Sequence, residues 1–190
     1  MAPGRSEIER MRILRARGGD EAAIGELIDA HSAALIGYVV SLIGDHHQAE
    51  DLAQETFLRA LEHLDKFDPS RPFRPWLLKI GRNLTLNWLN SRAARERAES
   101  DDMDTKYNIG TDTNPEDAAK ASERISGVKR ILELLPVHFR DVLHLRYIEG
   151  YNYEEISREL ELPAGTVKTW LHRAKKAFLK EAESSGIQFN

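Results

Sequence analysis

The sequence predicts an all-α protein of two small helical domains, joined by an acidic flexible linker, with a helix-turn-helix in the second domain. Three observations lead to this prediction. Apolar residues recur at spacings of three and four residues in most segments, and strand signals are nearly absent. A polar, acidic segment separates the two halves. Near the C-terminus, a short capped helix precedes a basic helix.

The bulk composition excludes several classes of protein. The 190 residues suffice for one ordinary domain or two small ones. The chain contains no Cys, which excludes disulfides, thiol catalysis and cysteine-ligated zinc. We find no apolar run long enough to span a bilayer, and the N-terminal segment lacks the apolar core of a signal peptide. We therefore expect a soluble, cytoplasmic protein.

The first domain is expected to cover residues 1–95. Its helices are predicted over Glu21–Ile43, His46–Leu64 and Phe73–Arg95. Gly44 ends the first helix, and the two prolines of FDPSRP end the second. Pro75 is tolerable in the third helix because it lies in the first turn.

The linker is predicted over residues 96–117, and the second domain over residues 118–190. The linker carries eight acidic residues against two basic ones and almost nothing apolar to bury, so it cannot offset the entropy of ordering. The helices of the second domain are predicted over Ala118–Leu135, Pro136–Tyr147, Asn152–Leu160 and Pro163–Glu183.

The segment YIEGYNYEEISRELELPAGTVKTWLHRAKK has the layout of a helix-turn-helix. Gly150 breaks the preceding helix, and Asn152 with Glu155 has the spacing of a capping box. In such motifs the second helix enters the major groove of DNA. An apolar stripe seats this helix on a core, and its other side chains are candidates for contacts with bases and phosphates. They are Lys168, Thr169, His172, Arg173, Lys175 and Lys176.

The third helix of the first domain carries a second basic stretch, in which no acidic residue lies between Arg71 and Arg95. Its predicted buried stripe is Leu77, Ile80, Leu84 and Trp88. Another face carries Lys79, Asn83, Asn87 and Asn90, with Arg71, Arg74, Arg82 and Arg92 around it. Amides and cations in this pattern suit hydrogen bonding to unpaired bases and phosphates. We expect Trp76 and Trp88 to be core residues rather than stacking platforms.

The helix before it carries an acidic face of Asp51, Gln54 and Glu55, while Leu52 and Phe57 face elsewhere. Such a face is usually only solvated. His46 and His47 lie beside Glu50 and Asp51, but adjacent histidines point in different directions on a helix and no third ligand is apparent. We therefore expect no metal and no cofactor.

Several motifs in one order resemble a known family. DLAQETFLRAL, FRPWLLKIGRNLTLNWL, the acidic segment and LPVHFRDVLHLRYIEGYNYEEISRELELPAGTVKTWLHRAKK are similar to bacterial RNA polymerase sigma factors of the extracytoplasmic function group, in the sigma-70 family. The resemblance runs from about Gly18 to about Lys180. It implies a non-catalytic initiation factor that binds core RNA polymerase and promoter DNA, both duplex and single-stranded. An anti-sigma factor is a further implied partner.

The resemblance also implies roles for individual residues. Core polymerase binding is implied for Asp51, Leu52, Gln54, Glu55 and Phe57. The promoter box nearest the start site is implied to be opened and held by the loop Phe67–Phe73 and the helix after it, with Arg71, Arg74, Lys79, Arg82, Asn83 and Asn87. The upstream box is implied to be read by the helix from Thr166 to Lys176, in which Trp170 departs from the basic or small polar residue common in the family. The linker is implied to thread through polymerase toward the RNA channel.

Three other classes remain open on the residues alone. A transcription regulator could use the helix-turn-helix without polymerase, which leaves the row of Asn83 and Asn87 unexplained. A helical metal-dependent hydrolase would need His46 and His47 as ligands. An adaptor would use only the acidic face.

Overall fold

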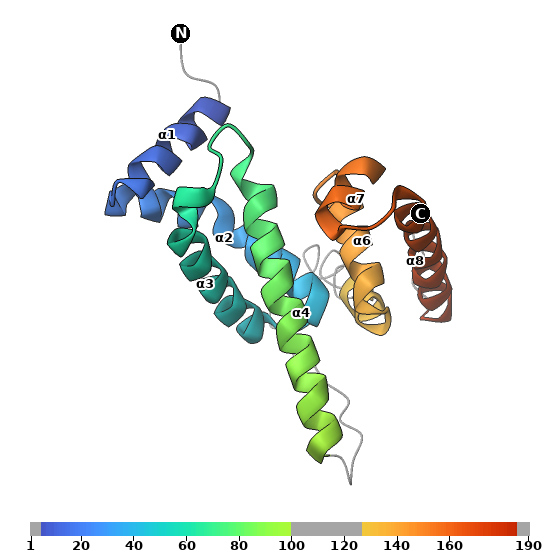
Figure 1. The fold of residues 1–190 in the computed structure, drawn as a ribbon. Helices are drawn as coiled ribbons and strands as arrows, with labels where there is room; N and C mark the ends of the chain where they lie inside the picture. The colour runs from blue at the N-terminus through green and yellow to red at the C-terminus, as the bar shows by residue number, and fades with distance from the viewer. Residues whose placement is uncertain (1–4, 100–126, 186–190) are drawn as a thin grey trace, which may run out of the picture. The chain divides into compact units, whose positions relative to one another are not determined.

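The structure, a computed structural model, describes residues 5–99 and 127–185, and all regular secondary structure in these two ranges is helical. The chain divides into two compact units, the first carried by helices α1 to α4 and the second by the helices after residue 126 (Figure 1). The all-α prediction with two helical domains is confirmed. Most of the predicted linker and the residues 118–126 of its neighbouring helix lie outside the described residues.

The first helix, α1 (Arg5–Arg17), is missing from the predicted set. It buries Ile13 and Ala16 but leaves Ile8, Met11 and Leu14 exposed. Its apolar pattern is therefore weak, and the sequence signal that identifies the other helices does not apply to it.

The second helix, α2 (Glu21–Ile43), has the predicted bounds. It begins after Asp20, whose Oδ1 accepts a hydrogen bond from the Ala23 N–H at 3.1 Å. Length and composition would allow α2 to cross a membrane, which corrects our expectation from the sequence. This is weak evidence, because a core helix can have the same length and composition, and Leu27, Leu35 and Tyr38 of α2 are almost fully buried.

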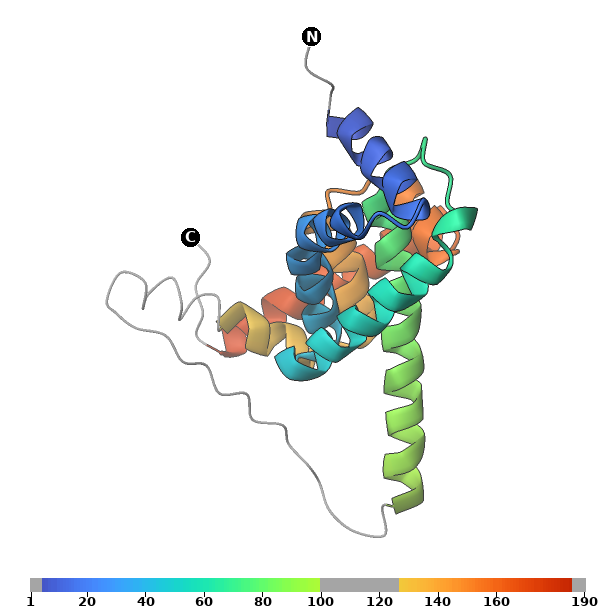
Figure 2. The same cartoon turned by 90° about the vertical axis from the view of Figure 1, so that its left-hand side faces the viewer.

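Two further helices complete the first unit. α3 (His46–Glu62) starts at the cap Asp45 and ends earlier than predicted, and a short 3-10 helix, η1 (Leu64–Lys66), follows it. After a loop, α4 (Phe73–Glu99) starts where predicted and continues beyond Arg95. The last turns of α4 project beyond α3 in both views (Figures 1 and 2).

An aromatic cluster joins η1 to the start of α4. The ring centroids of Phe67 and Phe73 lie 5.5 Å apart in an edge-on arrangement, and the Trp76 ring lies 4.8 Å from that of Phe67. Trp76 is thus packed within the unit, as the sequence predicts.

The second unit comprises helical residues 127–134, α6 (Val137–Tyr147), α7 (Tyr153–Leu160) and α8 (Ala164–Ser184). The last three agree with the predicted bounds to within one residue. They enclose a buried cluster of Val142, Leu145, Ile156, Leu160, Val167, Leu171 and Ala174. This cluster orients α8 and therefore determines which of its side chains are exposed.

Candidate nucleic-acid and protein interfaces

Helix α8 presents a cationic face to solvent. Its apolar side, Val167, Leu171 and Ala174, is buried in the core cluster. The exposed side chains are Lys168, Thr169, His172, Arg173, Lys175 and Lys176, and Thr166 is half-buried. No acidic residue lies between Leu162 and Lys180. This face is a suitable surface for a polyanion.

The turn before α8 is held by local hydrogen bonds. The Asn152 side chain accepts from the Glu155 N–H at 2.9 Å, and the Glu155 carboxylate accepts from the Asn152 N–H at 2.7 Å, which completes the predicted capping box. Glu161 adopts a left-handed conformation with φ of 56°. The Leu162 N–H donates to the Ser157 carbonyl at 3.0 Å, and the Ser157 hydroxyl donates to the Leu162 carbonyl. These contacts fix the turn, and the role of Ser157 was not foreseen from the sequence.

Trp170 belongs to the interior side of the second unit. Its half-buried ring packs against the core cluster, and its centroid lies 4.7 Å from that of His138. The ring is used largely for packing between α6 and α8. This placement accounts for a large aromatic residue on an otherwise cationic helix.

The amides of α4 share an exposed face. Asn83, Asn87 and Asn90 are exposed, and Lys79 and Arg82 are half-buried beside them. Of the predicted buried stripe, Leu77 and Leu84 are buried, whereas Ile80 and Trp88 are only half-buried. The Arg92 guanidinium lies over the Trp88 ring, 5.4 Å from its centroid.

The loop between Phe67 and Phe73 is anchored at both ends and exposed between them. Phe67 and Phe73 are 5% and 2% exposed, whereas the Arg71 side chain is 78% exposed. Within the loop, Asp68 accepts from the Ser70 hydroxyl at 2.7 Å and from the Ser70 N–H at 3.0 Å. These hydrogen bonds lower the pKa of the Asp68 carboxyl. Arg74, just after the loop, is half-buried.

Helix α3 presents a mixed acidic and apolar surface. Asp51 and Gln54 are exposed, and half-buried Glu55 pairs with Arg59 at 2.8 Å. Leu58, which is 59% exposed, lies four residues after Gln54 and so on the same side of the helix. We call Asp51, Gln54, Glu55 and Leu58 the α3 surface. Leu58 was missed because one exposed Leu makes no periodic pattern.

Two residues expected to bind polymerase lie beneath the α3 surface. Leu52 and Phe57 are only 7% and 8% exposed. They contribute to the core of the first unit, and a direct contact with a partner is not available to them in this conformation.

The histidines at the start of α3 form only exposed pairs. His46 and His47 lie 3.6 and 3.8 Å from the Glu50 carboxylate. Among residues 5–99 and 127–185, no three His, Cys, Asp or Glu side chains gather in a group that could hold a metal ion.

Two families match the chain in the order of the two units. Sigma-70 region 2 matches residues 27–95, and Sigma-70, region 4 matches residues 127–178. The chain is 32% identical over 178 residues to the ECF RNA polymerase sigma factor SigW of Bacillus subtilis (strain 168), covering 90% of this chain and 95% of that one. It is also 32% identical over 177 residues to the ECF RNA polymerase sigma factor SigL of Mycobacterium tuberculosis (strain ATCC 25618 / H37Rv), covering 93% and 98%.

Solved structures share the fold. The sigma factor RpoE in complex with the anti-sigma factor NepR from Bartonella quintana matches with a TM-score of 0.69 at 22% identity, over 84% of this chain and 96% of that one. CnrH in complex with the cytosolic domain of CnrY matches with a TM-score of 0.62 at 26% identity, over 93% and 97%.

Proposed function

The chain belongs to the extracytoplasmic function group of the sigma-70 family, and from this premise we propose that it binds core RNA polymerase and directs transcription initiation at specific promoters. The observation that carries the proposal is the pairing of two exposed nucleic-acid surfaces within the two matched regions. One is the amide face of α4, and the other is the cationic face of α8. A sigma factor needs both, because it reads one promoter box after strand opening and the other as duplex.

These two surfaces assign a different promoter box to each domain. We assign residues 1–95 to sigma domain 2, residues 96–117 to the linker and residues 118–190 to sigma domain 4. Domain 2 contacts the minus-ten box through Arg71, Arg74, Lys79, Arg82, Asn83 and Asn87. Domain 4 contacts the minus-thirty-five box through Thr166, Lys168, Thr169, His172, Arg173, Lys175 and Lys176.

The α3 surface is the proposed site for core polymerase. It offers two acidic side chains, one amide and an exposed apolar side chain, Leu58, in one row. An apolar contact flanked by charged groups is typical of a specific protein interface. We assign Leu52 and Phe57 the role of supporting this row from the core.

The remaining assignments follow from family membership. We propose that the chain has no catalytic activity of its own and works in the cytoplasm, where polymerase and promoter DNA are found. An anti-sigma factor is the proposed regulatory partner, and a sigma factor of similar fold has been solved in complex with one.

The test is transcription of a genomic DNA pool by core polymerase with and without the purified protein. We expect initiation at a restricted set of promoters only when the protein is present. An unchanged pattern of transcripts contradicts the proposal. If the protein instead binds duplex DNA specifically without associating with polymerase, it is a helix-turn-helix regulator of the simpler kind.

A further inference from the structure

Helix α1 holds one end of the Phe67–Phe73 loop through Arg17. The Arg17 Nε donates to the Leu64 carbonyl at 2.8 Å, and the same guanidinium donates to the Phe67 carbonyl. Leu64 is the first residue of η1, and Phe67 directly follows η1, where the loop begins. A forked, permanently charged donor on two carbonyls fixes the direction in which the chain leaves η1.

The other end of the loop is held by Glu9, also on α1. Its Oε2 accepts a hydrogen bond from the Phe73 N–H at 3.3 Å, at the first residue of α4. This N–H belongs to a helix start and has no partner within the helix, and a carboxylate is favoured there by the helix dipole. The Oε1 of Glu9 lies 3.2 Å from Nε2 of His31, so Glu9 also ties α2 to the loop.

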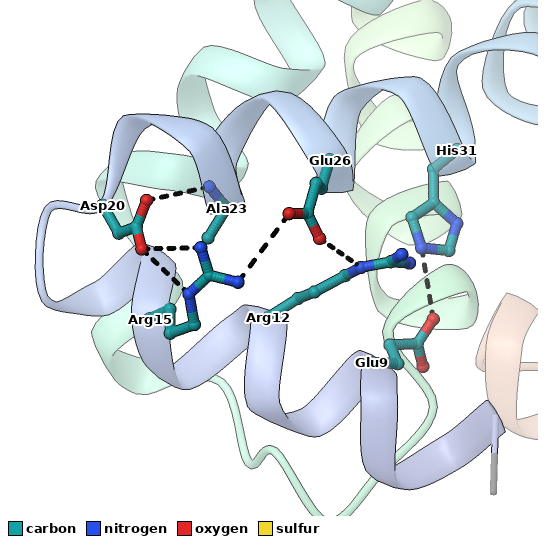
Figure 3. A network of polar contacts seen from close by, with 7 residues as sticks. All are labelled: Glu9, Arg12, Arg15, Asp20, Ala23, Glu26 and His31. Carbon is teal, nitrogen blue, oxygen red and sulfur yellow. Dashed lines mark hydrogen bonds and ion pairs between the residues drawn. The ribbon is translucent and has the colours of Figure 1, made fainter. Parts of the chain in front are cut away.

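A network of polar contacts, which includes Glu9, fastens α1 itself to α2 (Figure 3). Arg12 donates to Glu26 at 2.7 Å, and Arg15 pairs with Asp20 at 2.8 Å. Glu9 and His31 form one end of this network, and Arg15 and Asp20 form the other (Figure 3). Anchoring to α2 and anchoring of the loop therefore use different arginines.

We propose that Arg17 and Glu9 are positioning residues for promoter opening: they clasp the two ends of the Phe67–Phe73 loop and so set the base preference of its exposed middle. The inference rests on the proposed function, because it assumes that this loop meets the displaced strand. Arg17 and Glu9 lie before the region 2 match, which begins at residue 27, whereas the loop ends that they hold lie within it.

The physical reason is entropy. The contacts described for the exposed middle of the loop are local: Asp68 accepts from Ser70 and lies 3.6 Å from the Arg71 guanidinium, and the Arg71 N–H donates to the Asp68 carbonyl at 3.0 Å. A loop that is fixed at both ends before DNA arrives loses less conformational freedom when it binds a base. Releasing either end lowers the population that is ready to capture the base, and it weakens discrimination between bases.

The test uses Arg17→Gln and Glu9→Gln with two matched controls on the same helix. Arg10 and Glu7 form an exposed ion pair at 3.4 Å and make none of the loop contacts described above, so Arg10→Gln and Glu7→Gln are the controls. Arg12→Gln is a third comparison, since it loosens α1 from α2 but removes no bond to the loop. Each full-length variant is measured with core polymerase for association, for promoter opening and for opening on promoters with every base at each minus-ten position.

We expect Arg17→Gln to open native promoters roughly tenfold more slowly, and to relax base discrimination at one minus-ten position, with polymerase association unchanged. Glu9→Gln should act in the same direction but less strongly, because the amide oxygen still accepts from Phe73. On pre-melted promoters, which need no opening, Arg17→Gln and Glu9→Gln should start transcription at the rate of the unmodified protein. Arg10→Gln and Glu7→Gln should match the unmodified protein.

Three results overturn the inference. The first is unchanged opening and base preference in Arg17→Gln. The second is a parallel loss of polymerase association, opening and binding to upstream duplex, which shows that Arg17 supports the fold in general and not the loop. The third is equal amide hydrogen exchange of the loop in Arg17→Gln and Arg10→Gln. Amide hydrogen exchange of residues 64–73 in the free protein separates this inference from the proposed function. Faster exchange in Arg17→Gln than in Arg10→Gln shows that Arg17 holds the loop, even if the protein fails to start transcription. Equal exchange in the two variants shows that it does not.

Discussion

The two units hold their proposed DNA-binding surfaces in different ways. In the second unit, the turn before α8 is held by near neighbours: the capping box joins residues three positions apart, and Ser157 holds Leu162 five positions on. In the first unit, the Phe67–Phe73 loop is held by Arg17 and Glu9, which lie 50 and 64 positions from their acceptor or donor. The turn before the proposed duplex-reading helix is thus held by local contacts, and the ends of the loop proposed to meet unpaired DNA are held by long-range contacts.

This difference predicts which substitutions each surface tolerates without losing its orientation. We expect α8 to keep its orientation as long as the buried core cluster of the second unit is intact. The Phe67–Phe73 loop has no secondary structure and little local stability, so its conformation should depend on both Arg17 and Glu9. The predictions below test this contrast, starting with the change expected to have the largest effect.

The strongest test of the second unit is Ile156→Ala. Ile156 is fully buried between α7 and α8, so the truncation leaves a cavity and should cost about 2–5 kcal/mol in the unit's free energy of unfolding. Binding to upstream duplex should fall with it. Amide hydrogen exchange of α6, α7 and α8 measures the effect, because tryptophan fluorescence would also report Trp76 and Trp88 of the first unit. Ile156→Val is the graded control and should cost about 0.5–1.5 kcal/mol. Equal stability of the alanine variant and the unmodified protein would show that this core does not orient α8.

The next test asks whether the α3 surface meets polymerase. Asp51→Asn with Gln54→Ala should weaken association, because each charge-assisted hydrogen bond lost at an interface costs on the order of 1.5–3 kcal/mol. Both side chains are exposed, so the fold should survive. Titration of core polymerase with labelled protein gives the affinity. Leu58→Ser should also weaken it, and Glu62→Gln, one turn beyond Leu58 and exposed, is the control. A folded double variant with unchanged affinity would mean that the face is merely solvated.

Specific and non-specific contacts on α8 should separate in a comparison of two substitutions. Arg173→Ala should cost about 1–3 kcal/mol on promoter duplex and relax preference at one base pair, if the guanidinium is bidentate to a guanine. Lys176→Ala, later on the helix, should weaken binding to all duplexes alike and make the salt slope shallower by roughly one unit. Both side chains are exposed. Binding to promoter and scrambled duplex over a salt series is the measurement. No change in either variant would remove α8 as the reading surface.

A smaller effect is expected for the amides of α4. Asn83→Ala and Asn87→Ala should each remove hydrogen bonds worth about 0.5–1.5 kcal/mol to unpaired bases, and so slow promoter opening. Both are exposed, so stability should hardly change. Asn90→Ala on the same face is the comparison that shows how far the surface extends. If initiation on native and on pre-melted promoters responds equally to these changes, the amides have no role in strand opening.

The sequence predicts the second unit almost completely and the first unit only in part. Periodicity and capping signals place α6, α7 and α8 to within one residue, because the forces that start and end these helices act over a few residues. The helical pattern turns Leu52 and Phe57 away from the acidic face, and both are buried, although the family resemblance implies that they bind polymerase. Periodicity also misses α1 and its contacts with the loop, since hydrogen bonds between residues 50 positions apart have no periodic signature.

The last and smallest effect concerns acid and the anchor around His31. Burial lowers the pKa of this imidazole below its ordinary 6.5, although Glu9 acts to raise it; Arg74 and Arg12 lower it further. The unfolded chain therefore takes up a proton near pH 6.5 while the folded unit still resists it. Stability is complete above that pH and is lost as the pH falls toward the folded pKa, by at most about 1.4 kcal/mol per pH unit for one proton. We expect the first unit to unfold more easily at about pH 5.5 than at about pH 7.5, and His31→Gln to flatten this dependence.

His172→Gln is the matched control, because His172 is exposed on α8. Unfolding of the first unit at several pH values measures the slope, and an equal slope in His31→Gln and His172→Gln would show that the buried imidazole is not its source.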